Sequence, residues 1–465
     1  MSSTLSLGFA ALLLISLPYW LPAAVIRLRM RIFTRINGEE ALQLPNGQLG
    51  PEVFRRVYSH AAVTGRSRGA KLSDLFWYWL APGPEMHQEH LENGPRYEQI
   101  AGLTRRILAV PRAAIETLLE RCAAEVWAAR PEKRWEFVRL RDMMMPLWAS
   151  FYYELVFREE CPPTARRLIV DNANDVVTAL KCCGLRHMQK RRKLTELLLG
   201  KVQAGELPHE FPPGFTALEQ AYYLQGTYFN TAIVQMSEAM AHLLMTLAQH
   251  PQVQEQLTSS PQDRQLYDRV IDECLRLHPL FGIAHRITTA ELQLDGIILG
   301  KNSVVCFNYP EYHKAGYTQP EAFHPDRWQH CPAKEANFIP FGISANRPCP
   351  AHGIALVSMR HLLTIVLRRY RFATAAEHTR SLPNRGPCLR SVRHEQALSA
   401  WALGSLLLWM KLSDRWESVI RSVVQLILGT MMIIDARRLR LCERHFAALD
   451  GGKADANSRS AATLR

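Results

Sequence analysis

The stretch FIPFGISANRPCPA, residues 338–351, carries more information on fold and chemistry than any other part of this chain. Its one cysteine, Cys349, follows a run of small and turn-forming residues, and Arg347 stands two positions before it. From Ile354 to Leu367 the apolar spacing predicts a helix. A cysteine on a loop just ahead of a helix can present a thiolate to a metal and leave the far face of that metal open. Cys349 is therefore a candidate metal ligand.

Two more blocks precede this loop in the sequence. ECLRLHP at residues 273–279 is followed by AHR at 284–286, and FHPDRW occupies residues 323–328. An E-x-x-R motif alone is weak, because it is often an ordinary ion pair on a helix. Three blocks in this order resemble the cytochrome P450 family, over roughly residues 58–390 and most firmly from Ala221 onward. The resemblance implies a mainly α fold with small β-sheets, built as a single large domain.

The resemblance also implies a cofactor, haem b, with Cys349 as the axial ligand of the iron. Such a thiolate raises the electron density that favours O–O cleavage. Arg347 and Arg286 match basic positions that hold the haem propionates in this family, and Arg106 or its neighbour Arg105 is a third candidate. A guanidinium binds a carboxylate through two hydrogen bonds.

A phenylalanine is expected to pack beside the cysteine sulfur. Phe341 is the candidate for this contact, and Phe338 remains an alternative, because the loop has one residue more than the family pattern. Glu273, Arg276 and Arg327 are expected to form a buried ion network that fixes the loop, where loss of one partner is costly.

The central helix departs from the family pattern. Counting back from Pro251 places Thr231, Val234 and Gln235 in the oxygen-activating segment, with Val234 at the acid and Gln235 at the alcohol. Valine does not titrate, and an amide does not readily give up a proton. A different register uses Gly226 and residues 230–231, but it needs a gap inside a helix.

Three alternative functions are therefore expected. The first is a monooxygenase that oxidises a hydrophobic small molecule (a secondary metabolite, terpenoid, polyketide or lipid) with O2 and electrons from a separate NADPH-dependent reductase or ferredoxin. The second is a peroxide-driven or rearranging haem-thiolate enzyme without the usual proton relay. The third is a haem-binding protein without turnover.

Composition limits the partners. The 465 residues carry a net charge of +13 and 48% hydrophobic residues, enough for a large core. The ten cysteines show neither a disulfide framework nor zinc-site spacing. With a haem-thiolate core, the basic surface favours an acidic electron donor or a membrane, and no nucleic acid is expected.

Both ends of the chain are apolar. Residues 5–26, after a short tail at 1–4, are long enough to span a bilayer, and the arginines that follow predict a single-pass anchor with the catalytic domain on the cytosolic side. A cleaved signal peptide is the alternative, which fits less well because residues 1–4 carry no basic side chain. Residues 27–57 are interpreted as a basic linker and 58–393 as the haem domain. Residues 394–465 are expected to hold two apolar helices, 397–410 and 419–434, and a disordered end. The two helices are expected to lie at a membrane interface, and a helical pair packed on the main domain is the alternative.

Overall fold

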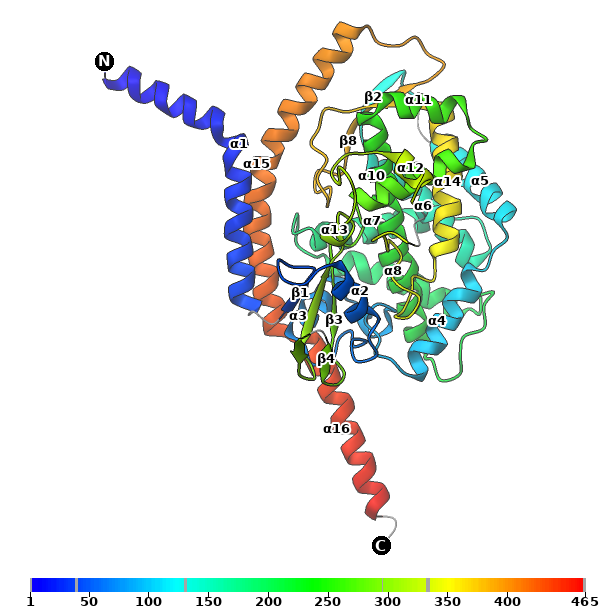
Figure 1. Cartoon of the computed structure of the whole chain (residues 1–465). Coiled ribbons are helices and arrows are strands. Elements are labelled where there is room, and N and C mark those ends of the chain that lie inside the picture. Colours follow the sequence, from blue (N-terminus) through cyan, green and yellow to red (C-terminus); the bar gives the residue numbers. More distant parts are fainter. Residues whose placement is uncertain (1, 38–40, 129–131, 295, 332–334, 463–465) are drawn as a thin grey trace.

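The computed structural model describes residues 2–37, 41–128, 132–294, 296–331 and 335–462, and most of them are helical (Figure 1). The helices are α1 Ser2–Asn37, α2 Pro51–Ser59, α3 Lys71–Leu80, α4 Pro95–Leu108, α5 Arg112–Ala128, α6 Leu140–Phe157, α7 Pro163–Leu180, α8 Met188–Gln203, α9 Ala217–Leu224, α10 Ile233–Gln249, α11 Pro251–Ser259, α12 Arg264–Leu277, α13 Tyr309–Tyr312, α14 His352–Arg369, α15 Ala400–Leu439 and α16 Leu441–Ala462. Two short 3₁₀ turns are η1 Pro84–Met86 and η3 Pro325–Gln329, and a π-helical segment, η2, covers Gln225–Ala232.

The strands form small sheets at the edges of the helical body. They are β1 Ala41–Leu44, β2 Trp135–Arg139, β3 Ile283–Ile287, β4 Leu292–Leu294, β5 Ile297–Leu299, β6 Val304–Asn308, β7 Tyr370–Ala373 and β8 Pro387–Val392. In one sheet β6 pairs in parallel with β1 and antiparallel with β3, and in another β8 lies between β2 and β7. The predicted fold class, mainly α with small β-sheets, is confirmed.

The core lies around α10 and α6, which pack against each other in the middle of the molecule. Trp148, Tyr152 and Tyr153 on α6 are fully buried, as are Met240 and Leu244 on α10. A helix that is apolar on nearly every side belongs in the interior of a large domain. This arrangement places η2, at the start of α10, next to the loop that holds the cysteine.

The domain begins earlier than the sequence suggested. Residues 41–59, interpreted as the end of a basic linker, form β1 and α2. Leu44 pairs with Phe307 of β6, and Phe54 and Val57 are completely buried in the same cluster. The boundary at residue 58 was therefore wrong, because strand pairing with a segment far along the chain does not show in local composition.

The C-terminal extension also differs from expectation. The two apolar stretches are joined into one continuous helix, α15, because Asp414 and other polar residues between them turn toward the domain and bind it. The expected disordered end starts as helix, since α16 continues to Ala462 through a segment rich in alanine and free of proline. Residues 463–465 lie outside the described part, as does residue 1 of the predicted N-terminal tail.

Candidate functional site

The cysteine loop is folded back on itself just ahead of α14. The backbone N–H of Cys349 donates to the carbonyl of Phe341 at 2.9 Å, and the turn needs Gly342, whose φ is +77°. The backbone N–H of Ala351 points at the cysteine sulfur and lowers the thiol pKa, but burial outweighs it and raises the pKa to about 11. A thiol in this position ionises readily only when a cation coordinates it.

The structure separates the two phenylalanine candidates. Phe341 lines the same cavity as Cys349. Phe338 is buried elsewhere, where its ring lies 4.8 Å from the ring of Trp328. Phe341 is therefore placed to pack beside the sulfur side of a bound group, and Phe338 fixes the start of the loop to η3.

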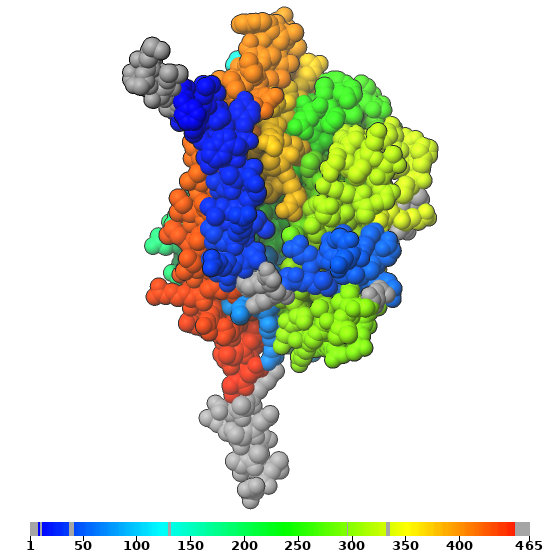
Figure 2. Space-filling view, turned by 60° about the vertical axis from the view of Figure 1, so that its left-hand side comes forward, coloured from blue at the N-terminus to red at the C-terminus, as the bar shows by residue number. Residues whose placement is uncertain are grey.

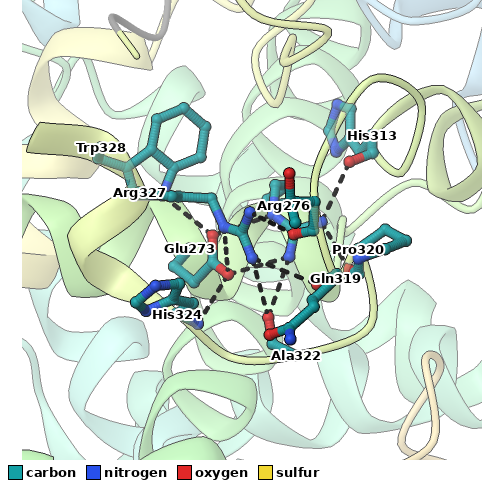
Figure 3. A network of polar contacts seen from close by, with 10 residues as sticks. Glu273, Arg276, His313, Gln319, Pro320, Ala322, His324, Arg327 and Trp328 are labelled. Atoms are coloured by element: carbon teal, nitrogen blue, oxygen red, sulfur yellow. Dashed lines mark hydrogen bonds and ion pairs between the residues drawn. The ribbon is translucent and has the colours of Figure 1, made fainter. Parts of the chain in front are cut away.

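The predicted ion network is present and buried (Figure 3). Glu273 on α12 accepts from Arg276 and from Arg327, each at 2.9 Å, and both Glu273 and Arg276 are fully inaccessible to solvent. The Glu273 carboxylate also accepts from the indole of Trp328 at 3.1 Å. Because Trp328 packs on Phe338, the network connects α12 with the beginning of the cysteine loop.

A cavity with about 1370 Å³ of space not filled by atoms lies above this loop. The residues predicted from sequence that line it are Cys349, Phe341, Arg347, Arg286, Thr231 and Gln235. They come from four separate segments: the loop, β3, η2 and α10. The chain thus brings the proposed ligand, the proposed anion-binding residues and the proposed oxygen-activating residues together around one space.

Three arginines line this cavity, and each has a buried guanidinium nitrogen that lacks a hydrogen-bond partner among the described residues. Arg286 and Arg66 are almost completely buried, and the Nε of each has no hydrogen-bond partner among the described residues. Arg347 donates to the carbonyl of Leu91 at 2.7 Å, while its Nε and Nη1 lack a partner in the same described part. Buried positive charge without a partner is unfavourable. The residues therefore fit an anionic group, and the two propionates of haem b match both the charge and the position beside Cys349.

Neither arginine that the sequence suggested on α4 lines the cavity. Arg106 and Arg105 are exposed, and the side chains of α4 that line the cavity are Tyr97, Thr104 and Leu108. Arg106 is two residues from Thr104, which places it on the opposite face of a helix. Arg66, in a loop that the sequence analysis did not single out, occupies the cavity wall instead.

The oxygen-activating segment contains an irregular turn. The π-helical η2 ends at Ala232, and the hydroxyl of Thr231 donates to the carbonyl of Gly226 at 2.8 Å. A π-helical turn holds extra residues, and such turns recur at functional sites. The extra residue of this turn corresponds to the gap that the alternative register, with Gly226 and Thr231, requires inside the helix.

His87, which sequence reasoning did not select, completes this arrangement. Its Nδ1 accepts from the backbone N–H of Glu89 at 3.3 Å, so the proton of the neutral ring is on Nε2, which hydrogen-bonds Thr231. Burial lowers the pKa of His87 to about 4. The only sequence signal was a cluster of polar residues after the Pro-Gly-Pro turn at 82–84.

The other two central-helix residues are placed differently from each other. Val234 lines a neighbouring cavity of about 1230 Å³ and does not line the one above Cys349. Gln235 lines both. Val234, which the sequence placed at the acid position, therefore does not reach the cavity above Cys349. The titratable group beside Thr231 is His87.

Three histidines lie together beside the middle of α10. His242 Nδ1 and His378 Nε2 are 2.9 Å apart, and the ring of His278 stacks on that of His378 with centroids 3.7 Å apart. The lone pairs of an imidazole lie in its ring plane, so stacked rings direct their nitrogens side by side. This arrangement is a stack of neutral rings and lacks the convergence that a metal ion requires.

Comparisons with known proteins agree with this geometry. The sequence model described as Cytochrome P450 matches residues 189–398. "Cytochrome P450 3A2" of Rattus norvegicus is 29% identical over 165 residues, which are 30% of this chain and 32% of that protein. "Beta-amyrin 11-oxidase" of Glycyrrhiza uralensis is 33% identical over 147 residues, 30% of each chain. The matched segment spans about a third of these relatives.

Solved structures show the same fold over more of the chain. "Cytochrome P450SP alpha" in complex with (R)-ibuprophen covers 74% of this chain and 89% of its own, with a TM-score of 0.60 and 14% identity. A zebra fish cytochrome P450 with Abiraterone covers 74% of this chain and 92% of its own, with a TM-score of 0.60 and 17% identity. At these identities the likeness concerns the fold.

Proposed function

Because this chain belongs to the cytochrome P450 family, whose cofactor is haem, we propose that it is a haem-thiolate monooxygenase that oxidises an apolar small molecule. The observation that carries the proposal is the cavity in which Cys349 lies with Arg66, Arg286 and Arg347, each of which has a buried nitrogen without a hydrogen-bond partner among the described residues. A cysteine thiolate and three guanidiniums with free donors suit a planar cofactor that has a metal at its centre and carboxylates at its edge.

Five residues of the cavity would have a role toward this cofactor. Cys349 would ligate the iron, and the N–H of Ala351, which points at the sulfur, would tune its charge. Arg286, Arg347 and Arg66 would bind the propionates. When bound, haem b would supply the activation of dioxygen, which a thiolate ligand favours.

Proton delivery in this proposal uses Thr231 and His87. The Thr231 hydroxyl turns from the Gly226 carbonyl, gives its proton into the cavity and takes one from His87 Nε2, with which it is hydrogen-bonded. His87 Nδ1 takes a proton from solvent at the half-exposed side chain of Glu89, which lines the same cavity, so that the ring stays neutral. This pair replaces the acid and alcohol that Val234 and Gln235 cannot provide.

A peroxide-driven reaction is the second candidate, and one observation favours it. Neither Val234 nor Gln235 offers a titratable group, so the segment read in its ungapped register has no acid. A peroxide-driven enzyme needs no reductase and no proton relay for dioxygen. The two candidates therefore differ in the source of the oxygen atom.

Electrons come, in this proposal, from a separate reductase or ferredoxin, for which a chain of net charge +13 offers a complementary surface to an acidic donor. The substrate enters through the second cavity, which shares Thr231, Gln235 and Arg286 with the first and opens beside the exposed Phe281. The domain is attached to a membrane through α1 and lies on its cytosolic side.

Isotope labelling tests the proposal. The haem-loaded full chain, a reductase and NADPH are incubated with an apolar test substrate under labelled dioxygen, and consumption of NADPH is recorded. Incorporation of one labelled atom per turnover is expected. Label that comes only from added peroxide, with no NADPH-dependent reaction, would support the second candidate. Failure of both oxidants to give product would overturn both.

A further inference from the structure

Helices α1 and α15 lie side by side and run in the same direction (Figures 1 and 2). The guanidinium of Arg415 on α15 lies 4.8 Å from the ring centroid of Tyr19 on α1. Further along, a Cβ added to Gly429 would come within 3.1 Å of Phe33. The step from Tyr19 to Phe33 equals the step from Arg415 to Gly429, so the register is constant and the two helices are parallel.

The inner face of α15 is fastened to the catalytic domain along its length. Asp414, which is buried, accepts from the amide of Asn384 at 3.1 Å. Gln425 donates to the carbonyl of Lys181 at 2.8 Å. These contacts connect α15 to the loop before β8 and to the end of α7. The helix therefore follows the surface of the domain.

The direction of the helices limits how they meet a membrane. The domain, from β1 to β8, connects the C-terminal end of α1 with the N-terminal end of α15. If two parallel helices crossed a bilayer together, these two ends would lie on opposite sides of it, and a domain on one side could not join them. In addition, α15 has 40 residues, about 60 Å of helix, twice the thickness of the hydrocarbon core.

The outer face of α15 carries an uninterrupted apolar stripe. From Leu412 to Ile434, every residue classed as exposed is a large apolar one. Its members include Leu412, Trp416, Ile420, Val423, Ile427 and Met431. They recur at steps of three and four residues, which places them on one face of a helix.

The part of α1 beside this stripe and just ahead of it has a matching composition. Leu12 to Ile15, Tyr19 and Trp20 are exposed, and the exposed arginines Arg27 and Arg31 follow. A protein partner covers one face of a helix, whereas lipid surrounds one that is apolar on several sides. Tryptophan and tyrosine with nearby arginine are typical of the layer between lipid headgroups and acyl chains. The positive charge favours anionic lipids.

We propose that α1 and α15 together form a membrane seat, defined as α1 from Leu12 and the outer face of α15, which lies in the plane of an anionic bilayer surface and does not span it. The seat rests on the proposed membrane residence and not on the oxygenase chemistry. It places the whole domain flat against one leaflet, so that an apolar substrate can pass from lipid toward the cavities without crossing bulk water.

Vesicle flotation and protease protection test the seat. The full haem-loaded chain is mixed with sealed phosphatidylcholine vesicles, with or without phosphatidylserine, and a triple variant, Trp416→Glu, Ile420→Glu and Ile427→Glu, is compared with the control Leu218→Glu on α9. We expect the affinity of the triple variant for the vesicles to be at least about tenfold lower, because each change replaces an apolar side chain that would lie in lipid with a charged one. The control should bind as the parent does, and phosphatidylserine should strengthen binding of the parent.

An epitope placed ahead of Ser2 gives a readout that needs no variant in the seat. On sealed vesicles we expect protease added outside to remove it together with the domain. Protection of the epitope would show that α1 spans and would overturn the proposal. Equal vesicle binding by the triple variant and the parent would also overturn the proposal. So would a dimeric parent and a monomeric triple variant that float equally well, because the stripe would then be a dimer interface. The absorption spectrum of the haem is recorded throughout, so loss of the haem site alone is recognised as failure of the proposed function.

Discussion

His87 and Thr231, 144 positions apart in the sequence, are joined by a hydrogen bond inside the cavity that Cys349 lines. The hydroxyl of Thr231 donates a hydrogen bond to the carbonyl of Gly226. The resulting chain runs from an imidazole through a hydroxyl into an irregular helical turn. The pair of His87 and Thr231 takes the role that the sequence assigned to Val234 and Gln235, neither of which can supply a proton.

Replacement of His87 by phenylalanine should lower the NADPH-dependent oxidation rate by about 10²–10⁴-fold, the usual contribution of a proton-transferring group. Binding of an apolar substrate, followed by the haem spectrum, should change little. Thr231→Val should have a similar effect, and the double variant should be no slower than the slower single one if the two residues act as a unit. Rates for His87→Phe equal to the parent's, with unchanged pH dependence, would remove His87 from the relay.

Replacement of Arg347 by glutamine should weaken haem retention, because it removes one of the cations that we propose bind the propionates. The expected change is a faster transfer of haem to an apo-globin acceptor, by about tenfold for the loss of one charge-assisted hydrogen bond. Arg106→Gln is the matched control, because Arg106 is exposed on the far face of α4. Equal haem loss from the two variants would contradict the assignment of Arg347.

Replacement of Glu273 by glutamine should destabilise the fold by about 3–5 kcal/mol, because it leaves Arg276 as a buried charge without its partner. Urea unfolding followed by circular dichroism measures this change. The control is Glu116→Gln, which breaks a partly exposed pair with Arg112 and should cost about 1 kcal/mol or less. A result for Glu273 as small as the control would show that the network does not hold the loop.

The stability of the protein should fall as the solution becomes acidic, and His313 is one cause. Its Nε2 accepts from the backbone N–H of Ile339 at 3.1 Å, and burial lowers its pKa to about 3. An unfolded chain takes up this proton near pH 6.5, whereas the folded chain does not. The contribution is complete above that pH and is lost as pH falls toward 3, by about 1.4 kcal/mol per pH unit for one such group.

Urea unfolding at a series of pH values measures this slope. His313→Gln keeps a side-chain oxygen that can accept from Ile339 but no longer titrates, so its slope should be shallower than the parent's. A slope that does not change would exclude His313 as a contributor. The comparison is made between the two proteins at each pH, which cancels the effect of other buried histidines such as His87.

How much the sequence predicts depends on whether the relevant partner is local. The pair of Glu273 with Arg276 lies within one short motif and is confirmed. The loop around Cys349 is another short motif, and it lies at the cavity that the expected site residues line. The choice of Arg106 failed because helical phase decides which side chain faces the cavity, and a short apolar pattern did not fix that phase.

Other features depend on contacts between distant segments. The boundary before β1 was missed because that strand pairs with β6, more than half the chain away. The polar residues in the middle of α15 separate two apolar stretches, which suggested two helices. The helix is continuous because Asp414 accepts a hydrogen bond from Asn384 of the domain. The register of Thr231 could not be chosen, because a π-helical turn holds additional residues that no pattern of fixed period describes.

The absorption spectrum of the reduced protein under carbon monoxide tests the central claim most directly. The parent should show the Soret band at the wavelength that gives the family its name, which requires a thiolate on the iron. Cys349→Ala should lose that band, while Cys331→Ala, a change in the neighbouring loop before the cysteine stretch, should keep it. A parent without the band, or a Cys349→Ala protein that retains it, would contradict the assignment of Cys349 and with it the proposed chemistry.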